Sequence, residues 1–459
     1  MPGPDRALRA ALDISRVLGD SRVITDPDQL ERFGGDESEE PPRVPDAAIL
    51  PRTASEAARC LSIASEHGVP VTPRAGGTGK TGGAVPVEGG LVLACEKMNR
   101  IKEIDAGDLV AVVEPGVILA DLHCAVEDQG LFYPPDPASL DSCCLGGNVA
   151  ENAGGPRAFK YGVTGHYVLR LDVALPSGAI LRCGHRPVKG VAGYDLAGLF
   201  TGSEGTLGLF TEITLRLIPR PRQVSTVLAL FPGLADAGRG IQAVLAAGLV
   251  PRVLEIMDRE CVDTVRDGGV PLPPGIEALV LTELDGSEAA VAGDLERAGE
   301  TLTRAGAQDV LVATGTVERD RLWRARRELS EALRSRKAHK ISDDVAVPRS
   351  RLVAVLERIE SIGLAHGLVS ATYGHAGDGN LHVTFLWDDP GLEAGAAAAR
   401  EEVMRLALEM DGTVSGEHGI GSVNRRYLEM ELGREAMALT RGLKKLLDPA
   451  SILNPGKIL

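Results

Sequence analysis

The sequence predicts an α+β protein of two or three domains, in which a glycine-rich ligand-binding domain precedes a second domain of mixed strands and helices. Three observations predict this fold. The chain has 459 residues, which is long for a single compact core. Glycine-rich loops at 73–84, 143–162 and 201–208 each adjoin an apolar strand. Beyond the run PRPR at 219–222, apolar segments alternate with helical ones.

The first half begins with a short helical arm that has an acidic, proline-rich end. A strand is expected at 47–50, and Thr53 with Glu56 forms a capping box that starts a helix ending at Gly68. Further apolar strands are expected at 69–72, 91–95 and 109–115, and a hairpin at 168–183 that turns at Pro176–Gly178.

The second half contains long helical patterns between short apolar runs. The expected elements are strands at 225–231 and 278–284, helices near 234–247, 287–305, 318–337, 350–366 and 391–410, and a hairpin at 371–387. The chain is thereby divided into four segments: a helical arm at 1–45, a ligand-binding domain at 46–221, a substrate or cap domain at 222–410, and a C-terminal segment at 411–459 that completes the site.

Composition narrows the function. A net charge of −15 and an aromatic content of 3% argue against a nucleic-acid surface, which needs a basic patch. The seven cysteines are odd in number and scattered, which suits a reducing compartment. None of them has a CxxC spacing, so a thiolate-bound cluster is not expected. No secretory signal and no membrane span are expected, and the expected location is the cytoplasm.

The loop at 73–84 (PRAGGTGKTGGA) has five glycines together with Arg74 and Lys80. Glycine allows the backbone to approach a ligand closely, and successive backbone N–H groups can then form a nest for a pyrophosphate. The spacing matches neither a Walker loop nor GxGxxG. Taken alone, the same composition is also typical of a flexible surface loop, whereas three such loops beside strands suit one long ligand such as a dinucleotide.

The ordered motifs PRAGGTG, EPGV, PPDPAS, GGNVAENAGG, KYG, GYDL and LFTGSEGTLGLFTEITLRL span most of 40–221. Together they resemble the FAD domain of the vanillyl-alcohol oxidase superfamily, also called the PCMH-type domain. The resemblance implies a bound FAD. No histidine is present in the first loop, so we expect the FAD to be bound non-covalently. The implied flavin-binding residues are Pro73, Arg74, Ala75, Gly76, Gly77, Thr78, Gly79, Pro137, Gly146, Gly147, Asn148, Asn152, Gly154, Gly155, Tyr161, Gly162, Glu204, Gly205, Ile213 and Asn454.

Histidines and a glutamate gather in two other glycine-rich loops. His375 and His382 flank a predicted turn at 377–380, and Glu417 precedes His418 in SGEHGIG. Two imidazoles and a carboxylate form the ligand pattern of a catalytic metal with open positions, which leaves His418 as an unligated base. The alternative is that these histidines are structural polar groups and not ligands. Their clustering with glycines in two compact loops weakens that alternative.

The runs LWRARRE, DVAVPRSRL, GHAGDGNLH, SGEHGIG and LLDPASILNPGKIL resemble the D-2-hydroxy-acid dehydrogenase branch of the same superfamily. The resemblance implies that His375, His382 and Glu417 bind a divalent metal, with zinc favoured over manganese or iron. It makes His418 the base and Arg326 the substrate-carboxylate arginine, although Arg326 also suits a solvated helix face. Lys340 and Thr384 are further substrate-binding candidates. Thr384 stands where 2-hydroxyglutarate members have Asn, and the runs LWRAR and DVAVP look more like the lactate members. D-lactate is therefore favoured, with glycolate and D-2-hydroxyglutarate as alternatives.

Two other functions stay open at this point. One is a transferase similar to alkylglycerone-phosphate synthase, and the other is a flavin subunit without its own catalysis. For the dehydrogenase, relatives imply that electrons pass to an iron–sulfur subunit, an electron-transfer flavoprotein or a quinone. Attachment to the inner face of a membrane would then depend on that partner, and an oligomer is an open expectation.

Overall fold

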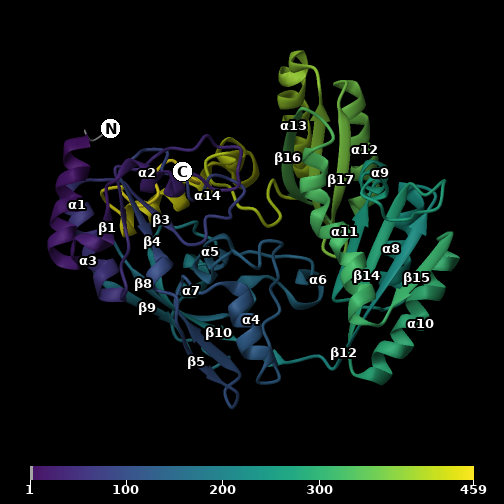
Figure 1. Ribbon diagram of the computed structural model, residues 1–459, viewed down its shortest axis with the longest axis horizontal. Coiled ribbons are helices and arrows are strands. Elements are labelled where there is room, and N and C mark those ends of the chain that lie inside the picture. Colours follow the sequence, from purple (N-terminus) through teal and green to yellow (C-terminus); the bar gives the residue numbers. More distant parts are fainter. Residues whose placement is uncertain (1–3) are drawn as a thin grey trace. The chain divides into compact units, whose positions relative to one another are not determined.

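The computed structural model describes residues 4–459, apart from the side chains of Arg324, Ala325, Glu328 and Glu331. The first three residues of the predicted arm therefore lie outside the described part. Contacts divide the chain into two compact units (Figure 1). The first contains the chain up to Gly154, residues 163–220 and residues 418–459, and the second contains residues 155–162 and 221–417.

The N-terminal part of the first unit is a four-stranded sheet with the order β1-β2-β4-β3. β2, β3 and β4 are parallel, whereas β1 pairs antiparallel with β2. Alanine-rich faces of α1 and α3 pack with these strands in one apolar core. The elements are α1 (Pro4–Leu18), β1 (Val23–Ile24), α2 (Pro27–Leu30), β2 (Ala47–Ile49), α3 (Ala54–His67), β3 (Val71–Arg74) and β4 (Leu91–Ala94).

The predicted capping box at the start of α3 is only half formed. Thr53 Oγ1 accepts a hydrogen bond from the Glu56 backbone N–H at 3.2 Å, as expected of an N-cap residue. Glu56, however, accepts from the N–H of Arg52 at 2.7 Å instead of from the Thr53 N–H. Gly68 ends the helix with φ of 60°, the left-handed conformation in which glycine is favoured.

The second sheet of this unit is antiparallel with the order β5-β6-β10-β8-β9. The predicted hairpin at 168–183 is confirmed as β8 and β9. Leu453, near the C-terminus, forms a parallel bridge to Val71 of the first sheet, where Figure 1 draws the yellow segment. The elements are β5 (Ile101–Asp105), β6 (Val110–Val113), α4 (Leu119–Glu127), β7 (Leu131–Phe132), α5 (Leu145–Glu151), β8 (Val168–Ala174), β9 (Ile180–Gly184), α7 (Leu196–Phe200), β10 (Leu209–Arg216), β11 (Ile218–Pro219) and α14 (Arg425–Leu447).

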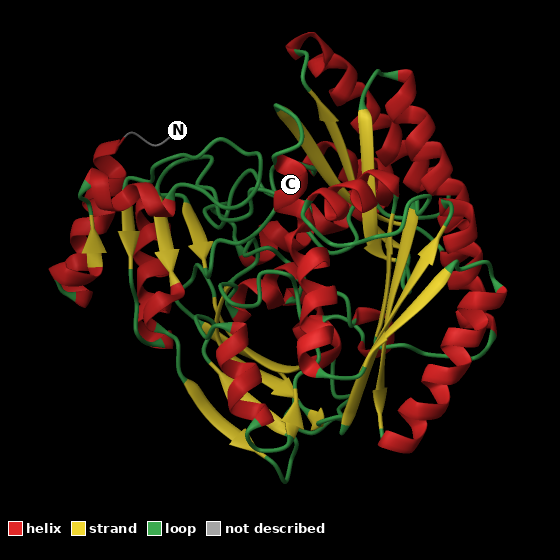
Figure 2. Ribbon diagram, turned by 45° about the vertical axis from the view of Figure 1, so that its right-hand side comes forward, coloured by secondary structure: helices red, strands yellow, loops and turns green. Residues whose placement is uncertain are grey.

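The second unit contains a seven-stranded antiparallel sheet with the order β15-β12-β14-β13-β17-β18-β16. Helices α8 and α10 pack on β12 and β14, and α9 and α12 contact β17 (Figure 2). The elements are α6 (Ala158–Tyr161), β12 (Gln223–Phe231), α8 (Leu234–Ala246), β13 (Val253–Met257), α9 (Arg259–Asp267), β14 (Ala278–Gly286), α10 (Glu288–Arg304), β15 (Asp309–Ala313), α11 (Thr316–Arg334), β16 (His339–Ala346), α12 (Leu352–Ala365), β17 (Val369–His375), β18 (Asn380–Trp387) and α13 (Glu393–Glu409).

The helices and strands predicted in this half are confirmed to within a few residues, but four elements were missed. These are β13, α9, β15 and β16. β13 is the central one, and its sequence VLEIM carries a charged residue inside a short apolar run. Such a run is ambiguous from periodicity alone. Among the described residues, no helix has the length and apolarity needed to cross a bilayer.

Candidate functional site

In the first unit, the glycine-rich loop begins where β3 ends, and it packs against the loop that leads into α5. A Cβ added at Gly76 would stand 2.7 Å from the carbonyl oxygen of Ser142, and one at Gly147 would stand 3.6 Å from Cβ of Ala75. Gly77 has φ of +69°, and a Cβ there would approach the Arg74 guanidinium to 2.1 Å. Glycine is therefore favoured at Gly76 by a close backbone contact and at Gly77 by its positive φ, whereas the Gly147 distance is an ordinary van der Waals contact.

The backbone N–H groups of this loop point to a ligand. Within the described part of the chain, the N–H groups of Gly76, Gly77, Thr78 and Gly79 donate to no other protein group. The loop is half-buried, so several such donors together are costly unless something accepts from them. A pyrophosphate supplies that many acceptor oxygens, which fits the predicted role of the loop.

Two other loops of the first unit contain buried polar atoms. Asn454 has φ of 41°, and its Nδ2 donates to the carbonyl oxygens of Gly83 at 2.9 Å and Glu204 at 2.8 Å. Asn454 Oδ1 and Ser203 Oγ are buried and have no hydrogen-bond partner among the described residues. Unpaired buried polar atoms are uncommon, and they fit a polar ligand such as FAD.

Most of the predicted flavin-binding residues lie in this first unit, and three do not. Gly155, Tyr161 and Gly162 cluster with the second unit, around α6. There the Tyr161 hydroxyl donates to Asp285 Oδ2 at 2.8 Å. The KYG motif therefore packs with the second unit, and the flavin contact predicted for it stays a prediction. The first unit contains Pro73, Arg74, Ala75, Gly76, Gly77, Thr78, Gly79, Pro137, Gly146, Gly147, Asn148, Asn152, Gly154, Glu204, Gly205, Ile213 and Asn454.

In the second unit, three side chains converge as the histidine motif predicts. The turn between β17 and β18 brings the rings of His375 and His382 to a centroid distance of 5.2 Å. Glu417 Oε1 lies 3.3 Å from His375 Nε2 and 3.5 Å from His382 Nε2. One donor atom from each residue lies within 4.8 Å of the others, and both histidines are buried. Two imidazoles and one carboxylate in this arrangement can hold a divalent cation.

Glu255, at the centre of β13, holds His375 from the other side. Glu255 Oε1 is hydrogen-bonded to His375 Nδ1, and the second carboxylate oxygen accepts from Arg326 Nε at 2.6 Å. Burial alone would raise the pKa of Glu255, but Arg326 and His375 outweigh it and lower that pKa to about 2. The permanent charge leaves His375 Nε2 directed at the cation position, the usual arrangement of a carboxylate behind a metal-binding histidine.

Electrostatics at His375 favour a positive charge. Burial disfavours the imidazolium, but the carboxylates of Glu255 and Glu417 outweigh it and raise the pKa of His375 well above its ordinary value. A site that holds a proton this strongly also attracts a metal cation, which would compete with the proton for the same nitrogen. The donor set and its charge therefore both fit a divalent metal.

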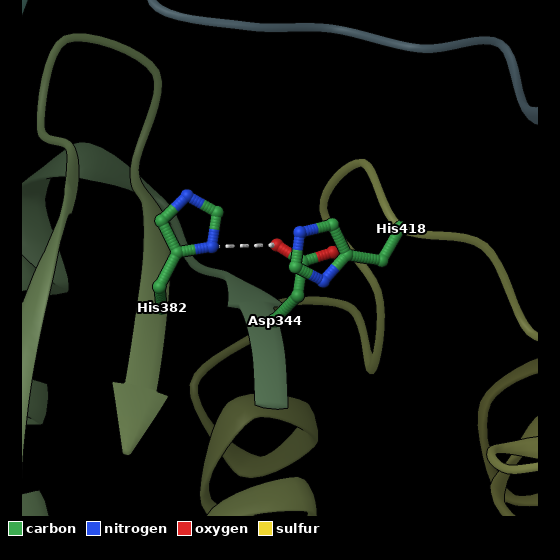
Figure 3. A group of neighbouring side chains, drawn as sticks. All are labelled: Asp344, His382 and His418. Carbon is green, nitrogen blue, oxygen red and sulfur yellow. Dashed lines mark ion pairs between the residues drawn. The ribbon is translucent and has the colours of Figure 1, made fainter. Parts of the chain in front are cut away.

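His375, His382 and Glu417 are called the trio below. Asp344 in β16 contacts two of its members, His382 and Glu417. Its Oδ1 lies 3.8 Å from His382 Nδ1, and its Oδ2 accepts from the backbone N–H of Glu417 at 2.7 Å. Figure 3 draws the ion pair as a dashed line, together with His418, the residue that follows Glu417 in the chain. Asp344 thereby fixes both the orientation of His382 and the backbone that carries Glu417.

The predicted base, His418, is the first residue of the C-terminal segment of the first unit. Its carbonyl oxygen accepts a hydrogen bond from Thr81 Oγ1 at 3.2 Å. It directly follows Glu417, so the predicted base and one of the predicted metal ligands are adjacent in the chain.

The three predicted substrate-binding residues all belong to the second unit. Arg326 is buried, with its guanidinium 4.5 Å from the ring centroid of Tyr373, so it is no part of a solvated helix face. Lys340 Nζ donates to the Ser330 carbonyl oxygen at 3.1 Å. Thr384 is buried in β18, with its hydroxyl 3.1 Å from that of Ser342.

Sequence reasoning assigned no role to Glu255 or Asp344. A signal for Glu255 existed, because a carboxylate in the apolar run VLEIM is costly to bury without a charged partner. Asp344 lay within the quoted run DVAVPRSRL, but the pairing of β16 with β18 that places it beside His382 was not predicted.

Comparisons with known proteins agree with this architecture. Residues 45–184 match the family described as "FAD binding domain", and residues 220–458 match "FAD linked oxidases, C-terminal domain". The chain belongs to the FAD-linked oxidase family, with the PCMH-type FAD fold, and is an FAD-dependent oxidoreductase.

Individual relatives cover most of the chain. The glycolate oxidase subunit GlcD of Bacillus subtilis is 42% identical over 90% of this chain and 89% of its own. The D-lactate dehydrogenase of Anaerostipes hadrus is 38% identical over 90% and 89%. Among solved structures, 4-ethylphenol oxidase from Gulosibacter chungangensis has a TM-score of 0.76 at 20% identity, covering 99% of this chain and 97% of its own, and supports the fold alone.

Proposed function

We propose that this protein oxidises a small D-2-hydroxy acid to the 2-oxo acid, with D-lactate favoured and glycolate or D-2-hydroxyglutarate as alternatives. The observation that carries the proposal is the convergence of His375, His382 and Glu417, backed by Glu255 and Asp344. Relatives named for glycolate and D-lactate support the substrate class.

His375, His382 and Glu417 would hold a divalent metal, which when bound polarises the substrate hydroxyl and lowers its pKa. His418 is proposed to take the hydroxyl proton as a general base. The first unit would hold FAD, which supplies the acceptor for the α-hydrogen as hydride. The substrate would thus lose its hydroxyl proton to His418 and its α-hydrogen, as hydride, to FAD. The carbon that carried the hydroxyl group would become a carbonyl carbon.

Arg326 is proposed to contribute to binding of the substrate carboxylate. Its Nε is already used by Glu255, so the terminal nitrogens remain for a ligand, and Arg326→Lys would lose that planar pair while keeping the charge. The specificity constant kcat/KM for D-lactate should therefore fall markedly, with metal content unchanged. A kcat/KM equal to that of the wild type would remove Arg326 from the substrate site.

The reduced flavin is proposed to pass its electrons to a protein partner or a quinone instead of oxygen. The test is turnover on a panel of D- and L-2-hydroxy acids, with an artificial dye in one set and air in the other. D-substrates should reduce the dye much faster than they generate hydrogen peroxide. Peroxide formed at the rate of dye reduction would make the protein an oxidase, and equal rates on D- and L-lactate would contradict the proposed preference for D-2-hydroxy acids.

A further inference from the structure

The loop at residues 418–421, which starts with the proposed base His418, is held by a side chain far away in sequence. Glu204 Oε1 accepts from the backbone N–H of Ile420 and Oε2 accepts from that of Gly421, both at 2.7 Å. A carboxylate that accepts two N–H groups at once makes hydrogen bonds stronger than neutral ones and fixes the orientation of both peptides.

Glu204 is itself firmly placed. It is 6% exposed and has φ of 48°, a left-handed conformation that is unfavourable for a residue with a side chain. Its N–H donates to the carbonyl oxygen of Ala150 at 2.9 Å, and its own carbonyl oxygen accepts from Asn454. A backbone strained and over-determined in this way is typical of a residue whose side-chain position matters.

Other groups close the loop on its remaining sides. The Thr81 hydroxyl donates to the carbonyl oxygen of His418, and a Cβ on Gly421 would stand 2.0 Å from the Thr81 carbonyl oxygen. A Cβ on Gly419 would stand 2.1 Å from Glu151 Oε2 and 3.0 Å from Glu204 Oε1. The loop therefore has little room to move while the Glu204 carboxylate is in place.

We propose that Glu204 is a positioning residue that fixes the His418 loop by accepting from Ile420 and Gly421. The link to catalysis rests on the proposed function of His418. Glu151 assists: burial and the neighbouring Glu204 raise the pKa of Glu151 well above its ordinary value, so it stays neutral. Burial also raises the pKa of Glu204, to about 7, while its two N–H donors and Lys457 lower it, so above that pH the negative charge of the pair belongs to Glu204.

The test is hydrogen–deuterium exchange of the FAD- and metal-loaded protein at mildly alkaline pH, read on a peptide covering residues 419–424. Glu204→Gln replaces one acceptor oxygen by an NH2 donor, so one of the two amides loses its partner. Exchange of that amide should quicken by about tenfold. Glu88→Gln makes the same charge change at an exposed position and should leave the exchange unchanged.

A second measurement separates positioning from general support of the fold. In Glu204→Gln, kcat for D-lactate should fall while KM, flavin content and Tm stay close to the wild type. If the variant does not retain flavin, Gly421→Ala displaces the same loop without altering Glu204, and its exchange should quicken likewise.

Unchanged exchange in Glu204→Gln and Gly421→Ala would overturn the proposal, and so would faster exchange with an unchanged kcat. A wild-type protein that turns over none of the 2-hydroxy acids would refute the proposed function. In that case the exchange comparison still decides whether Glu204 holds the loop.

Discussion

The glycine-rich loop at 73–79 and the trio of His375, His382 and Glu417 are two proposed ligand-binding regions built in opposite ways. The loop offers backbone N–H groups, and the side chains of residues 75–79 are small, so that the backbone can come close to a ligand. The trio offers side-chain nitrogens and oxygens, and its two histidines lie beside carboxylates from neighbouring strands, Glu255 at His375 and Asp344 at His382. FAD binding by the loop should therefore be weakened by substitutions that add atoms, and metal binding by the trio by substitutions that remove atoms.

The largest effect is expected where a side chain takes part in the reaction. His418→Asn keeps a polar side chain of similar size but cannot accept the proton, so kcat should fall roughly 10²–10⁴-fold. FAD and metal content should stay as in the wild type, because His418 is neither in the trio nor in the glycine-rich loop. A near-normal kcat would mean that the base is another group.

The second-largest effect is expected from replacing Glu255, the carboxylate that is hydrogen-bonded to His375. Glu255→Gln removes the charge that orients His375, so affinity for the bound metal should fall roughly 10–100-fold. Equilibrium dialysis against a metal buffer measures this directly. Glu360→Gln, at an exposed glutamate of the same unit, is the matched control. Equal affinities in both variants would show that Glu255 serves the fold alone.

In the loop, adding one methyl group should weaken FAD binding. Gly77→Ala must adopt a positive φ and place Cβ against Arg74, at a cost of roughly 1–2 kcal/mol, or about tenfold in the FAD dissociation constant. Titration of the flavin-stripped protein with FAD measures it. If Gly77→Ala bound FAD as the wild type does, the close-approach argument for this loop would be wrong.

The smallest effect should come from removing a side chain in the same loop. Thr78→Ala keeps the backbone N–H and leaves the neighbouring glycines unchanged, so FAD affinity should change by no more than about twofold. A much larger loss would mean that the Thr78 hydroxyl itself contacts the cofactor, and the contrast between the two regions would then be weaker than proposed.

The contrast also explains what could be predicted from the sequence. Motifs concentrated in short segments, such as GHAGDGNLH, contain their own turn, so the proximity of His375 and His382 follows from local geometry. Glu255 and Asp344 reach the histidines only through the pairing of β13 with β17 and of β16 with β18, which are long-range pairings. No local pattern encodes them, and neither β13 nor β16 was predicted.

Tyr161 is a second example of a long-range contact that the sequence alone does not predict. Its motif KYG lies in the middle of a run that otherwise belongs to the first unit, and the family resemblance implies a flavin contact, which stays a prediction. The structure joins residues 155–162 to the second unit, where Tyr161 bonds Asp285. Chain order alone could not reveal that a short segment packs with a sheet that begins about sixty residues later.

The most direct test of the proposed function is anaerobic rapid mixing of the FAD- and metal-loaded protein with D-lactate and, separately, L-lactate, followed by the flavin absorbance. We expect the oxidised flavin band to disappear in a single turnover with D-lactate and to persist with L-lactate, and His418→Asn should slow the change. A flavin that stays oxidised with D-lactate, glycolate and D-2-hydroxyglutarate alike, although FAD and metal are bound, would contradict the account.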